Sequence, residues 1–160
     1  MPRGTVDIEK TKHSKEVKLN LPEIDNTIQG CVYKLYCGKK YLIIKGKSLA
    51  GSLMLFEKGY SYFVAYEHNI TDKNRYYYKM YYYIFRHPDF KISIDVLLTS
   101  ESAYDLLMYE QQQLDKSMSD KKCFNNNLTS YINVFSEKTD SYGWMPKTEV
   151  EQFILYLKNQ

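Results

Sequence analysis

CVYKLYC-GKK-YLIIK, residues 31–45, is the stretch of sequence that decides the fold. Gly38-Lys39-Lys40 separates two β-rich runs, and this pattern predicts a β-hairpin. The loop length sets which side chains share a face of the sheet. A loop of all three residues places Tyr33 and Tyr41 on the same face, whereas a loop of Gly38-Lys39 alone places them on opposite faces. Both registers fit the sequence.

The chain beyond the hairpin predicts helices and one more strand. Residues 49–58 have helical spacing with Gly59 as the expected stop, and residues 60–66 fit either a strand or a helix. A helix is predicted over residues 74–85, because Asn74 can cap it and His87-Pro88 ends it. Residues 90–98 alternate at first between apolar and polar side chains and then become fully apolar, which predicts a central strand.

Two further helices are predicted from capping and periodicity. Ser100 can cap a helix that runs to about Ser117. Residues 147–157 are amphipathic, with apolar side chains on one face. Strands and helices therefore mix along the chain, as in an α/β (α+β) fold.

Composition excludes several classes of protein. The chain has 160 residues, of which 44% are apolar and 26% charged, so it is not collagen-like, disordered throughout or a disulfide scaffold. Its apolar runs are far shorter than the roughly 20 residues of a membrane span, and the charged N-terminus predicts no secretion signal. Three cysteines without a Cys-x-x-Cys pair predict buried thiols in a reducing compartment.

Charge and tyrosine content suggest two classes of partner. Residues 30–91 hold eleven Lys/Arg against four Asp/Glu, which suits DNA or an acidic protein surface, although a solvated lysine face fits equally well. Tyrosine is abundant, with 17 residues, and clusters at 76–78 and 81–83. Because these clusters lack alternation with Lys/Arg, they favour packing or protein contact over base stacking.

Glu110 is the candidate site residue that stands out on pattern alone. It lies within the apolar stripe of the helix predicted over residues 100–117, a stripe formed by Ala103, Leu107, Leu114 and Met118. A carboxylate there needs a cation, a hydrogen bond or a proton. Glu110 is therefore either a functional group or a core-edge residue that reaches solvent or pairs with a lysine.

The order of these elements over residues 29–131 resembles the GIY-YIG nuclease superfamily. Cys31-Val32-Tyr33 stands in the place of the first motif half and Tyr41-Leu42-Ile43 in that of the second. Residues 106–116, which contain Glu110, are similar to the family's helix with the metal-binding glutamate, and Asn125 follows in a polar loop.

The resemblance implies a three-stranded antiparallel sheet flanked by helices, and cleavage of phosphodiester bonds. It implies that Glu110 binds one divalent metal such as Mg²⁺ and that Tyr33 and Tyr41 orient or deprotonate the attacking water. Asn125 would complete the site, and an arginine on the first helix would stabilise the phosphate. We therefore expect the Glu110 side chain to point towards both tyrosines.

The sequence departs from the family pattern at that arginine. No arginine lies in residues 49–58, and no glycine follows Ile43 directly. A lysine cannot reproduce a bidentate guanidinium. The expectation is a catalytically degenerate domain that needs no cofactor and serves as a structural or interaction subunit, which argues against an enzyme without settling the question. The alternative is a Mg²⁺-dependent endonuclease that cleaves DNA.

Segments outside this domain suggest an assembly with other protein subunits. Residues 1–28 form an N-terminal arm and residues 132–160 a C-terminal extension with its amphipathic helix. Their apolar residues are expected to contact partners, although packing of the helix on its own domain is the simpler outcome: Val17, Leu19, Leu21, Trp144, Phe153 and Leu157. The Tyr- and Lys-rich style with two flanking arms is also similar to structural proteins of crAss-like tailed phages, which implies a virion or the host cytoplasm and no membrane.

Overall fold

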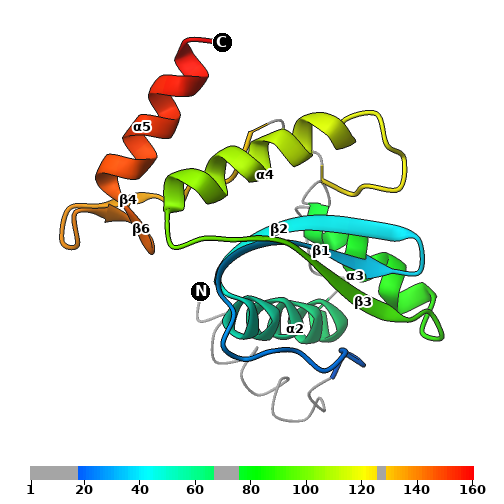
Figure 1. The fold of residues 1–160 in the computed structure, drawn as a ribbon. Coiled ribbons are helices and arrows are strands. Elements are labelled where there is room, and N and C mark those ends of the chain that lie inside the picture. The colour runs from blue at the N-terminus through cyan, green and yellow to red at the C-terminus, as the bar shows by residue number, and fades with distance from the viewer. Residues whose placement is uncertain (1–17, 67–75, 126–128) are drawn as a thin grey trace.

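A three-stranded antiparallel sheet forms the centre of the protein (Figure 1). The computed structural model describes residues 18–66, 76–125 and 129–160. The strands β1 (Gln29–Cys37), β2 (Lys40–Ser48) and β3 (Ile92–Thr99) lie in the order β2-β1-β3. Two helices cover one face of this sheet and a third covers the other, so the mixed α/β class and the three-stranded sheet are confirmed.

The hairpin between β1 and β2 has the two-residue loop Gly38-Lys39. Cys37 pairs with Lys40, and Tyr36 pairs with Tyr41. Gly38 has a φ of 60°, as expected for the first central residue of a type II′ turn. Tyr33 and Tyr41 consequently lie on opposite faces of the sheet.

Four helices are present in the described residues. They are α2 (Leu49–Tyr66), α3 (Tyr76–Arg86), α4 (Ala103–Ser117) and α5 (Lys147–Lys158). The predictions over residues 74–85 and 147–157 are confirmed where the chain is described, whereas the expected cap Asn74 lies outside the described residues. Ser102 rather than Ser100 caps α4, because its hydroxyl accepts a hydrogen bond from the Asp105 amide at 3.1 Å.

The predicted stop at Gly59 is wrong, because α2 continues through it to Tyr66. A glycine is needed there for packing rather than for termination. A Cβ atom at this position would overlap the hydroxyl of Tyr81 from α3, and that hydroxyl donates to the Phe56 carbonyl at 3.0 Å. Gly59 therefore lets the two helices approach closely.

The prediction that residues 90–98 form the central strand is also wrong, because β1 is central and β3 lies at an edge. The apolar run has a different cause. Ile92, Ile94 and Val96 pack on the side of α2 and α3, whereas Leu98 packs on the side of α4. An edge strand with helices over both faces needs apolar residues at successive positions, just as a central strand does.

The C-terminal extension packs mainly on α4, and Trp144 also contacts the cluster between α4 and the sheet. Three two-residue strands, β4 (Phe135–Ser136), β5 (Ser141–Tyr142) and β6 (Met145–Pro146), form a small second sheet that the sequence did not predict. Met145, Val150 and Phe153 are buried together with Ala103 and Leu107 of α4. The far end of α5 projects beyond the body of the protein (Figure 1). Within the described ranges, no helix is long and apolar enough to cross a membrane.

Replacing Gly59 with alanine should destabilise the fold despite the better helix propensity of alanine. Overpacking against Tyr81 is expected to lower the free energy of unfolding by about 1–3 kcal/mol, measured by urea denaturation. Lys58→Ala in the same helix is the control, because Lys58 is exposed beside Gly59 and its side chain can be shortened without a new contact. Equal stabilities of the two variants would contradict the packing role of Gly59.

Candidate functional site

The expected catalytic residues do not form one cluster. Tyr33 is buried on the side of α2, where its hydroxyl lies 2.7 Å from that of Ser52, and burial raises its pKa. Tyr41 lies on the side of α4, where its hydroxyl donates to Asp120 at 2.6 Å and lies 3.1 Å from the Ser117 hydroxyl. The expectation that Glu110 points towards both tyrosines is therefore wrong, because only Tyr41 shares its face of the sheet.

The Tyr41 hydroxyl is hydrogen-bonded to Asp120 and not to Glu110. Burial raises its pKa, and the hydrogen bond that it donates lowers the pKa of the Asp120 carboxyl. Ser117 lies seven residues beyond Glu110 on α4, about 10 Å along the helix axis at 1.5 Å per residue. Tyr41 thus joins the end of α4 to the hairpin, at a distance from the glutamate.

Glu110 instead forms a buried ion pair with Lys45 of β2. The Lys45 ammonium lies 3.1 Å from Glu110 Oε1, and the two side chains are only 4% and 7% exposed. The same ammonium donates to the Tyr131 carbonyl at 2.7 Å. The Ser130 hydroxyl donates to the same Glu110 oxygen. Of the two interpretations of Glu110, the structure therefore shows the lysine pair.

The hairpin register places Lys45 beside Glu110, and a glutamine holds the segment that covers the pair. Lys45 pairs with Val32 on the face that packs against α4, so its side chain runs towards that helix. Gln111, next to the glutamate, accepts a hydrogen bond from the Ser130 amide at 3.0 Å. Segment 130–131 is thereby held over the ion pair.

These residues do not fit a divalent metal. A metal ligand must direct a lone pair of its carboxylate towards the ion, and here a cation and a hydroxyl already occupy Glu110 Oε1. Across the described part of the chain, no three His, Cys, Asp or Glu side chains gather at one point. The chemistry implied for Glu110 by the family resemblance has no matching donor set.

Asn125 supports the edge of the sheet. Its side-chain oxygen accepts from the Ile43 amide at 2.7 Å, and its side-chain nitrogen donates to the Ile43 carbonyl at 3.0 Å. Just before it, the Phe124 backbone amide donates to the Tyr41 carbonyl at 2.9 Å. The Tyr41 backbone amide donates to the Lys122 carbonyl, also at 2.9 Å. Residues 122–125 thus cover the first half of the β2 edge.

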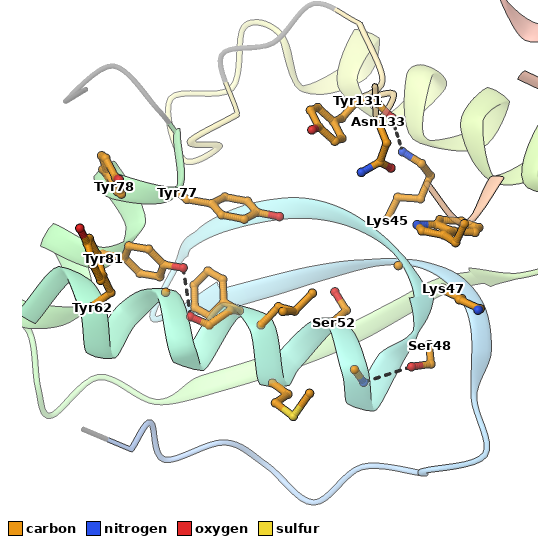
Figure 2. Close-up of a pocket in the computed structure, with 17 residues that line it drawn as sticks. Lys45, Lys47, Ser48, Ser52, Tyr62, Tyr77, Tyr78, Tyr81, Tyr131 and Asn133 are labelled. Carbon is orange, nitrogen blue, oxygen red and sulfur yellow. Dashed lines mark hydrogen bonds between the residues drawn. The ribbon is translucent and has the colours of Figure 1, made fainter. Parts of the chain in front are cut away.

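A groove lies beside the second half of that edge (Figure 2). It has a volume of about 690 Å³ between α2, α3 and segment 131–133, with β2 along its floor. Four tyrosines gather at one end, namely Tyr62, Tyr77, Tyr78 and Tyr81, while Lys45 and Lys47 lie at the other end with Tyr131. The described lining contains no carboxylate.

The rim of the groove is apolar and exposed. Leu55 is 68% exposed and Tyr131 56%, and Met54 and Tyr62 are exposed beside them. Exposed apolar groups that gather around a hollow are typical of contact sites. The tyrosine clusters in the sequence indicated a contact surface here. Nothing in the sequence indicated that segment 131–133 lines it.

The residues expected to contact partners pack on their own chain. Leu19 and Leu21 are half-buried against the core under α2, and the Leu19 amide donates to Glu57 at 2.9 Å. Phe153 is fully buried, and Trp144 and Leu157 pack beside it. Each of these residues therefore packs at least in part on its own chain, and their contact with a partner stays a prediction. Val17 lies outside the described residues.

The cysteines are free thiols. Cys31 and Cys37 are buried, and burial raises the pKa of each to about 11. Cys123 is only half-buried, which differs from the expected full burial.

No family model matches this chain, and neither the curated proteins nor the solved structures contain a match to it.

Removing either charge of the Lys45–Glu110 pair should strongly destabilise the protein. Lys45→Met or Glu110→Gln leaves one buried charge without its partner, which costs about 3–5 kcal/mol of unfolding free energy. The double variant buries no unpaired charge and should be more stable than either single variant. Urea denaturation measures all three.

Lys47→Met is the matched control, because Lys47 is exposed on the same strand. Its effect should stay within about 0.5 kcal/mol. Additive losses in the double variant, or equal effects at positions 45 and 47, would show that the pair is not coupled.

Proposed function

We propose that this chain is a catalytically degenerate GIY-YIG-like domain that acts as a structural or interaction subunit of a larger assembly. The observation that carries the proposal is the commitment of the Glu110 carboxylate to Lys45 and Ser130. The Lys45 ammonium already compensates the charge of this carboxylate, and a divalent metal beside it would be repelled by a buried cation. The carboxylate that would bind the metal in the family therefore has a structural role in this chain.

The other groups implied by the resemblance support the same proposal. Tyr33 and Tyr41 lie on opposite faces, and the hydroxyl of each has a protein partner. Asn125 binds the backbone of Ile43, and α2 contains no arginine. Phosphoryl transfer depends on a fixed cation and a metal positioned together at the phosphate. Because Tyr33 lies on the opposite face of the sheet from Tyr41 and Glu110, these groups do not all converge on one point.

The groove beside β2 supports an interaction role. Its wall is rich in tyrosine and its rim in exposed apolar groups, a composition that favours protein contact. The similarity in style to tailed-phage structural proteins makes a virion or the host cytoplasm the proposed setting. Three free cysteines are compatible with such a reducing compartment.

The purified chain should not cleave DNA. Supercoiled plasmid and single-stranded DNA, each incubated with the protein in Mg²⁺ or Mn²⁺, should give the same gel pattern as buffer. Lys45→Met, which releases the Glu110 carboxylate from its cation, should gain no activity, because the other groups remain dispersed.

The competing function is Mg²⁺-dependent DNA cleavage. Cleavage by the wild-type chain that disappears in Glu110→Ala, with the variant still folded by circular dichroism, would establish that function and remove the proposal.

A further inference from the structure

We infer that the groove beside β2 binds an extended acidic peptide from a partner protein, which adds as a strand to the second half of the β2 edge, where no described residue pairs with β2. The inference rests on the proposed interaction role and names the partner's chemistry. The predicted binding depends on the backbone of Lys45 and Lys47 and on the side chains that form the walls of the groove.

The chain already uses strand addition on the first half of this edge. Residues 122–124 pair with Tyr41 through two backbone hydrogen bonds, and Cys123 forms a parallel bridge with Tyr41. The Asn125 amide then occupies the next outward position, at Ile43. Both contacts involve odd-numbered residues of β2, whose amides and carbonyls point away from β1.

Lys45 and Lys47 are the next two positions with this outward orientation. Among the described residues, none forms a hydrogen bond with their backbone amides or carbonyls on that side. The side chain of Lys45 is only 4% exposed, yet the residue as a whole is half-buried. Its accessible surface is therefore main chain. Both residues line the groove, so the open edge faces into it.

The walls suit the side chains of an added strand. Alternate residues of a strand point to opposite faces, here towards α2 and towards Tyr131 and Trp144. Leu55 and Tyr62 on the first wall and Tyr131 on the second line the groove and expose apolar surface. Figure 2 shows Tyr62 and Tyr131. The volume of about 690 Å³ lies within the ~300–1,000 Å³ typical of ligand sites. A peptide with apolar or aromatic side chains at alternate positions fits these walls.

Charge favours a peptide that carries an acidic residue. Lys45 and Lys47 are the charged residues in the described lining. Glu110 neutralises Lys45, so the exposed Lys47 supplies the net positive charge. Main-chain hydrogen bonds give affinity in strand addition, and side-chain pockets give specificity.

A displayed library of nine-residue linear peptides, selected on the immobilised full-length chain without metal, tests the inference. Enriched peptides should alternate apolar and polar residues and contain Asp or Glu. Fluorescence anisotropy then measures the affinity of the best synthetic peptide. A 12-residue oligothymidine in the same assay tests for a nucleic-acid strand.

Two variants test the groove through different groups. Lys47→Pro removes an outward amide donor without removing a hydrogen bond to β1, as edge strands tolerate. Leu55→Lys changes an exposed wall position and leaves the sheet intact. Each should weaken peptide binding about tenfold or more, as expected for the loss of roughly 1.4 kcal/mol. Lys47→Ala keeps the amide and should weaken binding less than Lys47→Pro.

Leu155→Lys is the matched control, because Leu155 is 59% exposed on α5 and does not line the groove. Peptide affinity should be unchanged in this variant.

The inference is overturned by the absence of any enriched peptide, by affinities unchanged in Lys47→Pro and Leu55→Lys, or by oligothymidine binding that depends on these two positions. Self-association of the full chain that is lost in Leu55→Lys also overturns it, because the occupant is then a second copy. DNA cleavage would remove the proposed function without touching the groove, whereas a failure of peptide binding leaves the Lys45–Glu110 argument intact.

Discussion

The two-residue turn at Gly38-Lys39 fixes the register of the β1–β2 hairpin, and the arrangement of both faces of the sheet depends on it. With Tyr36 opposite Tyr41, the side chains of Tyr41, Ile43 and Lys45 run towards α4. Leu42 and Ile44 run towards α2 and α3. A slip by one residue would exchange these two sets and place the Lys45 ammonium in an apolar core. The register therefore decides which charge meets Glu110.

The Lys45–Glu110 pair in turn joins three parts of the chain that lie far apart in sequence. It connects β2, α4 and segment 130–131, which Gln111 holds in place. Desolvation of two charges makes such a pair a weak source of net stability, but an alternative packing that separates them leaves each charge buried alone. The pair thus penalises competing arrangements more than it stabilises the native one. It also keeps segment 131–133 beside β2, where that segment forms one wall of the groove.

Local patterns predicted much of the fold, while long-range contacts produced the errors. The hairpin, α5 and the need of Glu110 for a partner all follow from short-range spacing. The choice of Lys45 as that partner does not, since it requires the register. Gly59 has the local signature of a helix stop, and only Tyr81, from another helix, shows its packing role. The strands β4 to β6 have two residues each, too few for any periodicity. The groove joins residues about 80 positions apart, such as Lys47 and Tyr131.

The central claim is that Lys45, and not a divalent metal, neutralises Glu110. Isothermal titration of MnCl₂ into the wild-type chain and into Glu110→Gln tests it most directly, because a metal site on this carboxylate gives a binding isotherm that only the wild type shows. The account predicts indistinguishable heats for the two proteins. A one-site isotherm in the wild type that is absent from a folded Glu110→Gln protein would contradict it.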